Sequence, residues 1–125
     1  MSAAMSPSIL TSVKKNLGIS EEIEAFDPDI ILLINSNFSK LKQLGVGPEE
    51  TFQIQDELDE WEDFTDDNDV LGMAREFIYL SVKLAFDPPT ASVLNEMKNR
   101  VSELEWRLNV AGDSPIDRSD QNEQQ

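Results

Sequence analysis

Two residue types that enzymes and metal sites commonly use are absent: none of the 125 residues is cysteine or histidine. Without cysteine the chain has no disulfide, no thiolate nucleophile and no thiolate metal ligand, which is compatible with synthesis in a reducing cytoplasm. Without histidine it lacks the base of Ser-His and Cys-His catalysis and the commonest side-chain ligand of zinc. Ser-His and Cys-His nucleophilic catalysis and zinc sites built on histidine are therefore excluded.

Positive charge is also scarce. The chain has 10 Lys and Arg against 25 Asp and Glu, which gives a formal net charge of −15 and a pI near 4.1. Such a chain repels phosphate backbones and anionic lipid surfaces. Direct binding of DNA by the isolated chain is therefore disfavoured.

Long hydrophobic runs are missing as well. The longest, from Ile30 to Ile34, is far shorter than the roughly 20 residues that span a bilayer. The first residues, Met1 to Ser8, have neither the basic start nor the apolar run of a secretory signal. Hydrophobic residues still make up 39% of the chain, which is enough for one buried core. We expect a single soluble intracellular domain.

The hydrophobic residues that are present recur at spacings of three and four, which predicts an all-α fold, a small bundle of about four to five helices. The first predicted helix covers residues 9–17 and ends at Gly18. The second begins at the pair Asp27-Pro28, an N-cap followed by a first-turn proline. It stops at residues 45–48, where two glycines and a proline interrupt the hydrogen-bond ladder.

The middle of the chain is harder to assign. We predict a helix over residues 55–63, where the apolar spacing fits one in part. Residues 65–69 predict an acidic loop whose last acid, Asp69, caps the following helix. That helix is apolar on most faces from Val70 onward, so we expect it to be buried among the others. It ends at the Asp-Pro-Pro of residues 87–89, because the residue before a proline is pushed out of the α region.

A last helix follows, capped by Thr90 or Ser92, with one apolar seam of about four turns that ends at Leu108. The polar stretch after it cannot bury enough surface to order itself. The predicted organisation is a flexible N-terminus over residues 1–8, a helical domain over 9–110 and a disordered acidic tail over 111–125.

The acidic loop fails as a calcium site. Aligning Asp67 and Asp69 with the first two ligands of a calcium loop puts Leu71 at the third ligand position. Gly72 then falls at the turn position, but Ile78 takes the place of the bidentate glutamate. A solvated helix-capping loop fits the residues better than a metal site.

Carboxylates crowd residues 57–63, but abundance does not make a catalytic pair. Acid-base catalysis needs one carboxyl that is desolvated so that its pKa shifts, whereas crowded surface acids share water and stay ionised. We therefore expect no enzyme activity, no catalytic residue, no metal site and no cofactor.

Trp61 and Trp106 are the two tryptophans. Tryptophan is over-represented where subunits meet, although either residue can equally belong to the core. The residues alone thus predict an acidic, helical, non-catalytic protein.

Short motifs follow one another along the chain in a recognisable order. They are ILTSVKKNLGI at residues 9–19, DPDII at 27–31, QLGVG at 43–47, WEDF at 61–64, FDPP at 86–89 and ELEWRL at 103–108. In this order and spacing the chain resembles the head-tail connector proteins of tailed bacteriophages, also labelled head-completion or DNA-packaging proteins. The resemblance covers about residues 9–108.

The resemblance implies a structural virion protein at the head-tail junction, made in the host cytoplasm and without catalytic residues. In such proteins about a dozen copies form a ring beneath the portal protein, extend the DNA channel and dock a tail-side connector or stopper protein. DNA would pass through without specific binding, and no membrane is involved. The candidate residues for contact with neighbouring copies or partners are Trp61, Phe64, Phe86, Asp87, Pro88, Pro89, Trp106 and Arg107.

An acidic regulatory or DNA-mimic protein, which would bind one basic partner through its carboxylates, is the main alternative. The net charge supports it, but the order of the motifs does not. A carboxylate hydrolase or metal protein is a third hypothesis, which the spacing of the acids does not favour.

Overall fold

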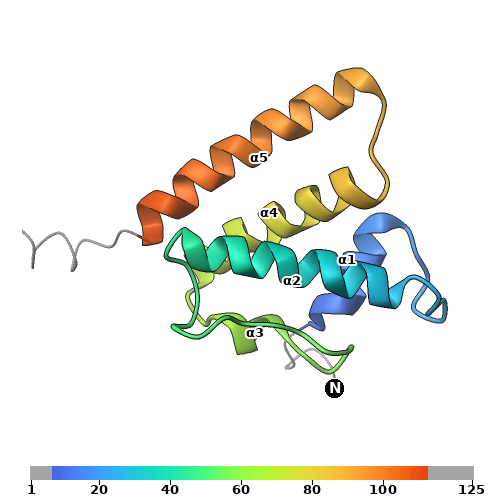
Figure 1. Ribbon diagram of the computed structural model, residues 1–125, viewed down its shortest axis with the longest axis horizontal. Helices are drawn as coiled ribbons and strands as arrows, with labels where there is room; N and C mark the ends of the chain where they lie inside the picture. The colour runs from blue at the N-terminus through green and yellow to red at the C-terminus, as the bar shows by residue number, and fades with distance from the viewer. Residues whose placement is uncertain (1–6, 113–125) are drawn as a thin grey trace, which may run out of the picture.

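The computed structural model describes residues 7–112, which form five α-helices and no β-strand within that range (Figure 1). The helices are α1 (Ile9–Leu17), α2 (Asp27–Gln43), α3 (Trp61–Phe64), α4 (Asn68–Phe86) and α5 (Ala91–Gly112). The predicted all-α bundle is confirmed. The predicted tail lies outside the described residues, apart from its first two positions, which belong to α5. Among the helices described, none is both long and apolar enough to cross a membrane.

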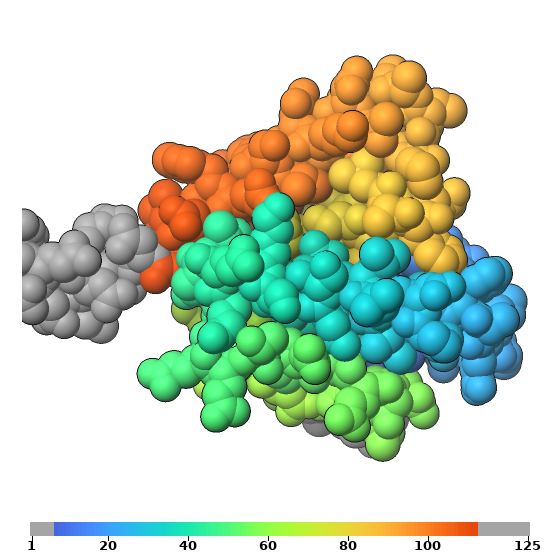
Figure 2. All heavy atoms as spheres, in the orientation of Figure 1, coloured from blue at the N-terminus to red at the C-terminus, as the bar shows by residue number. Residues whose placement is uncertain are grey.

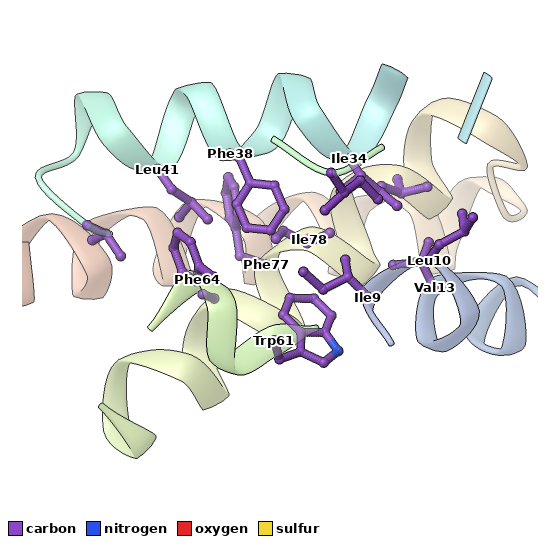
Figure 3. Packing of buried hydrophobic residues seen from close by; sticks show 14 of the residues in the cluster. Ile9, Leu10, Val13, Ile34, Phe38, Leu41, Trp61, Phe64, Phe77 and Ile78 are labelled. Carbon is purple, nitrogen blue, oxygen red and sulfur yellow. The ribbon is translucent and has the colours of Figure 1, made fainter. Parts of the chain in front are cut away.

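Helix α4 occupies the centre of the bundle and packs against α1, α2 and α5. It was expected to be buried among other helices, and four of its side chains are buried. Figure 3 shows how side chains from α1, α2, α3 and α4 meet in one core. The largest fully buried side chains include Trp61, Phe38, Phe77, Ile9, Ile30 and Ile34. One continuous core thus includes side chains from all five helices.

The helix ends follow capping chemistry. Ser8 caps α1 by accepting a hydrogen bond from the Thr11 backbone N–H at 3.2 Å, and Gly18 ends the helix with φ of +81°. Asp67, and not Asp69 as predicted, caps α4: its carboxylate accepts from the backbone N–H groups of Asp69 and Val70. The cap lies two residues earlier because α4 begins at Asn68 rather than at Val70.

The prediction of a helix over residues 55–63 is wrong for most of that range, because only the short α3 is helical there. Acidic side chains bind the backbone that a helix would need. The Asp59 carboxylate accepts from the Gln55 N–H at 2.7 Å, and Asp56 accepts from the Leu58 N–H at 2.8 Å. Short acidic side chains compete with helical hydrogen bonds in this way.

Contacts with other parts of the chain hold the stretch before α3 in a non-helical conformation. The Asn35 amide on α2 donates to the Ile54 carbonyl at 3.0 Å and accepts from the Ile54 N–H at 2.8 Å. Backbone hydrogen bonds then pair the stretch with the start of α1, from the Ile9 N–H to the Asp59 carbonyl and from the Trp61 N–H to the Pro7 carbonyl. These partners are distant in sequence, so the local pattern did not reveal them.

Candidate subunit interface

Two of the eight predicted interface residues are part of the core. Trp61 is 0% exposed and Phe64 is 4% exposed. Trp61 donates its indole N–H to the Ser12 hydroxyl at 3.3 Å, and the Phe64 ring packs 4.8 Å from that of Phe38, measured between ring centroids. Neither side chain presents a surface to a partner in this subunit.

The Phe86–Pro89 turn lies at one end of the bundle, where α4 ends. Phe86 is partly buried and meets Phe26, at the start of α2, edge to face with the ring centroids 5.6 Å apart. Phe26 itself is 45% exposed. We call this pair the Phe26–Phe86 patch. Asp87 and Pro88 beside it are exposed and Pro89 is partly buried.

Trp106 is the most exposed aromatic side chain of the described residues, at 68%. It lies on the side of α5 that faces away from α4. Its neighbour Arg107 joins a chain of ion pairs on the same helix: Glu103 contacts Arg107 and Arg100, each at 3.1 Å. Trp106 and Arg107 both face solvent in the single subunit. They therefore remain candidates for contact with a partner.

Sequence reasoning missed the other residues that share the Trp106 side of α5. They follow spacings of three and four, the spacing of one helix face, and all of them are exposed. We call this set the α5 outer face: Ser92, Asn95, Asn99, Ser102, Trp106, Asn109 and Val110. The exposed acids Glu96 and Glu103 lie beside them on the same side of the helix. Only the apolar seam of the helix was followed in the sequence, and this second, polar repeat could have been found in the same way.

Charge is distributed very unevenly along the fold. Between Lys42 and Arg75 the sequence has no lysine or arginine but eleven acids, all within residues 49–69, the acidic segment. These acids are Glu49, Glu50, Asp56, Glu57, Asp59, Glu60, Glu62, Asp63, Asp66, Asp67 and Asp69.

The helices that follow are balanced. Residues 70–112, which contain almost all of α4 and all of α5, have five acids and five bases. They are Glu76, Asp87, Glu96, Glu103 and Glu105 against Arg75, Lys83, Lys98, Arg100 and Arg107. The excess negative charge of the folded domain therefore lies away from the α4–α5 side.

An ion pair joins α4 to α5. Arg100 binds Glu76 through two hydrogen bonds of 2.7 and 2.8 Å. The guanidinium of Arg100 holds the pKa of the Glu76 carboxyl below its ordinary value, and Glu76, followed by Glu103, raises the pKa of Arg100. The pair links α4 to the first half of α5, which Figure 1 shows diverging from α2.

No group of three or more acids is placed to hold a metal ion within the described part of the chain. The acids of residues 65–69 act instead as caps and loop residues, and Asp67 serves the start of α4.

The chain matches a family model described as phage connector protein over residues 9–115. The match covers the whole helical domain, from the start of α1 to beyond the end of α5. The chain belongs to the phage connector protein family. No match was found among curated proteins or among solved structures. The resemblance seen in the sequence is confirmed at the level of the family. Phage connectors are structural proteins, so the role of this connector rests on its surfaces.

Proposed function

We propose that this connector is a ring subunit of the phage head-tail junction, which docks below the portal protein, extends the DNA channel and joins head to tail. The observation that carries the proposal is the family match across the complete helical domain. About a dozen copies would form the ring. Heterologous, head-to-tail contacts close into a ring when the rotation from one copy to the next divides a full turn evenly.

The charge distribution supports passage of DNA without binding. Residues 49–69 contain eleven acids and no base, so this segment repels a phosphate backbone. A channel wall that includes the segment would therefore let DNA slide. The near-neutral α4–α5 side supports contact between copies, because two faces of like charge would repel each other.

The test is to remove the protein from the phage that encodes it. We expect DNA-filled heads and separate tails, because the joining step fails, and we expect purified protein added to those heads to restore joined particles. Electron microscopy and infectivity measure both outcomes. Normal tailed particles without the protein would overturn the proposal.

The acidic segment also favours a second candidate, an acidic regulator or DNA mimic that binds one basic partner. Such a complex would have one copy of each protein and would weaken steeply as salt screens its charges. Native mass spectrometry separates the two functions, since a connector gives rings of identical copies that survive salt.

A further inference from the structure

We propose that residues 51–55, with the sequence Thr-Phe-Gln-Ile-Gln, form a free strand edge to which an extended, basic segment of another protein binds through backbone hydrogen bonds. We call this stretch the 51–55 edge. The inference rests on the proposed function, because the partner is expected among the proteins that adjoin the connector in the virion. It deepens that function by naming a docking surface and the chemistry of its occupant.

The 51–55 edge has the side-chain pattern of a strand. No helix, turn or bend occurs within it, and its side chains alternate between the core and solvent. Phe52 packs against Phe38 with the ring centroids 4.9 Å apart, and Ile54 is 2% exposed. The three exposed side chains are those of Thr51, Gln53 and Gln55. A period of two residues is that of a strand. Figure 2 shows the green segment that contains this stretch along the lower side of the molecule, away from α5.

One side of this backbone is occupied and the other is open. The N–H and the carbonyl of Ile54 bind the Asn35 amide, so they point toward α2. In a strand the backbone groups of successive residues point to opposite sides, so those of Gln53 point away from α2. Neither the N–H nor the carbonyl of Gln53 has a hydrogen-bond partner within the described part of the chain, and the same holds for Thr51. Unpaired groups on one side of a strand are the template for adding another strand.

The 51–55 edge is held in place before any partner binds. Asn35 fixes Ile54 through hydrogen bonds of 3.0 and 2.8 Å. The Phe52 ring contacts those of Phe38 and Phe64, with centroids 4.9 and 5.6 Å away. A backbone that is already fixed loses little conformational entropy on binding. Threonine, phenylalanine and isoleucine also favour strands, and none of the five residues is charged.

Charge indicates the occupant. Exposed acids flank the 51–55 edge, Glu49 and Glu50 before it and Asp56 and Glu57 after it. A segment with lysine or arginine at its ends therefore complements the edge. A second copy does not, because antiparallel pairing of two such edges would bring the acids before one against the acids after the other. Residues 113–125 do not supply the segment either, since they have four acids and one base.

The first experiment removes one backbone donor. Gln53→Pro deletes the N–H that a partner strand would bind, whereas the control Gln53→Ala keeps it. Because that N–H has no partner within the described chain, both variants should unfold at the wild-type temperature. We expect Gln53→Pro to need about tenfold more protein to join tails to DNA-filled heads that lack the connector, the effect of losing one or two hydrogen bonds. Joining by Gln53→Pro at the wild-type concentration would overturn the inference.

The second experiment compares two charge reversals, and it decides the matter if the proline variant does not fold. Glu50 and Glu96 are both exposed, and neither makes an ion pair within the described residues. Glu50→Lys should raise the protein concentration needed for joining severalfold, because it repels a basic segment. Glu96→Lys, on α5, should leave that concentration unchanged. Equal effects of the two variants would contradict the proposed occupant.

The third experiment identifies the occupant directly. The chain has no cysteine, so Gln53→Cys accepts a single photoactivatable cross-linker. Illumination of joined particles should link this position to a peptide of another virion protein that contains lysine or arginine, which mass spectrometry identifies. A link to a second copy, a link to an acidic peptide, or no link at all would overturn the inference.

Failure of the inference and failure of the proposed function give different results. If tails join normally without any connector, the proposed function is wrong. If wild-type protein restores joining and Gln53→Pro restores it equally well, the connector function stands and the 51–55 edge is not a docking surface. Native mass spectrometry of the purified variants covers the remaining case. If Gln53→Pro no longer forms the oligomers that Gln53→Ala forms, the edge binds a second copy and the inference is wrong.

Discussion

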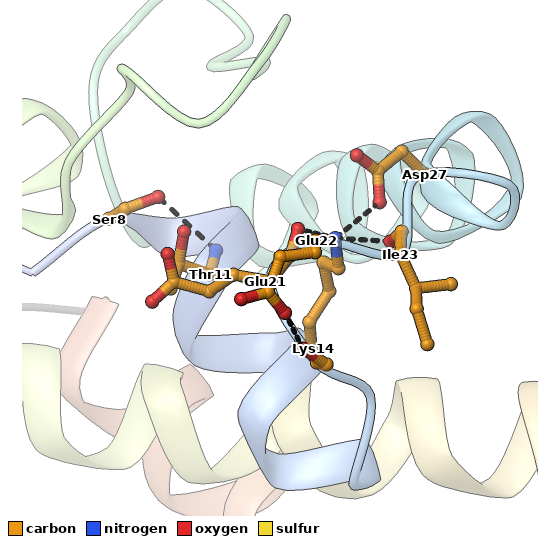
Figure 4. A network of polar contacts seen from close by, with 8 residues as sticks. Ser8, Thr11, Lys14, Glu21, Glu22, Ile23 and Asp27 are labelled. Atoms are coloured by element: carbon orange, nitrogen blue, oxygen red, sulfur yellow. Dashed lines mark hydrogen bonds and ion pairs between the residues drawn. The ribbon is translucent and has the colours of Figure 1, made fainter.

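Lys14 is the buried cation of the fold, at 3% exposure. Figure 4 shows its ammonium group reaching across from α1 to the loop before α2. It donates to the carbonyls of Glu21 and Ile23 at 3.1 and 2.6 Å, and lies 2.9 Å from Asp27 Oδ1. The contact to Asp27 is an ion pair rather than a well-directed hydrogen bond, because that oxygen has no hydrogen-bond donor among the described residues. One side chain thus holds the whole turn between two helices.

Replacing Lys14 with methionine should lower the free energy of unfolding by about 3 kcal/mol. Methionine keeps the apolar stem but leaves a shielded carboxylate and two carbonyls without their donor. Urea unfolding measures the change. Lys15→Met is the matched control, because Lys15 is exposed and should change stability by less than about 0.5 kcal/mol. Equal unfolding midpoints for the two variants would contradict a structural role for the ion pair.

The pair of Glu76 and Arg100 makes stability depend on pH. The pKa of Glu76 is lower in the folded state than its ordinary value of 4.5, so the unfolded chain binds this proton more readily. Its contribution to stability is therefore fully present above pH 4.5 and is lost as the pH falls through the folded-state pKa. Its side chain is 40% exposed, so solvent screening keeps the contribution in the range of about 0.2–1 kcal/mol.

Glu76→Gln should therefore be less stable than wild type at pH 7 by that small amount, and the difference should shrink as the pH falls below 4.5 and through the folded-state pKa of Glu76. Urea unfolding at pH 7 and at a series of acidic pH values checks this. The control is Glu49→Gln, an exposed residue that makes no ion pair within the described chain. A difference between Glu76→Gln and wild type that stays constant with pH would show that the pair does not act through its charge.

At the scale of elements, the Asn35 amide on α2 anchors the stretch before α3 through Ile54. Asn35→Ala removes both hydrogen bonds to Ile54, whose side chain is 2% exposed. We expect a loss of about 1–3 kcal/mol, because a backbone donor and acceptor lose their partner. Hydrogen exchange should show faster exchange at the Ile54 amide. Asn37→Ala is the control, since Asn37 bonds only the Leu33 carbonyl of its own helix, and it should leave that amide protected.

The end of α5 approaches the end of α2 closely through glycine. A Cβ on Gly112 would collide with the Leu44 carbonyl oxygen and would lie 2.8 Å from the Gly45 carbonyl carbon and oxygen. Gly112→Ala should therefore cost about 1–3 kcal/mol, the usual penalty for overpacking. Gly72→Ala, inside α4 with no atom within 4 Å of the added methyl, should instead stabilise the protein by about 0.5–1 kcal/mol. Thermal unfolding of the two variants should shift in opposite directions.

The sequence predicts an element well when the residues that stabilise it are close together in the sequence. The helices α1, α2, α4 and α5 were predicted because their caps and apolar spacing are local. The stretch over residues 51–60 was assigned partly to a helix, because its hydrogen-bond partners, Asn35 and the start of α1, are distant in sequence. The same limit applies to the predicted interface residues. The sequence alone does not distinguish the buried Trp61 from the exposed Trp106, whereas their exposure in the structure does.

At the scale of the whole molecule, acids outnumber bases most strongly in one part of the fold. The acidic segment has eleven acids and no base, whereas residues 70–112 are balanced. In the proposed ring, each copy brings its excess negative charge near that of its neighbours. Assembly must therefore overcome a long-range repulsion that the contact surfaces themselves do not create.

Salt should consequently promote assembly. The Debye length falls from about 30 Å at 0.01 M salt to about 10 Å at 0.1 M, which screens charges between copies but leaves apolar contacts intact. We expect oligomers to form at severalfold lower protein concentration at the higher salt, as measured by sedimentation or native mass spectrometry. Neutralising three exposed acids of the segment, with Glu49→Gln, Glu50→Gln and Asp66→Asn, should weaken this salt dependence. An acidic regulator held to a basic partner by charge behaves in the opposite way, since its complex dissociates as salt rises. The sign of the salt effect therefore distinguishes a connector from a charge mimic without knowledge of either partner.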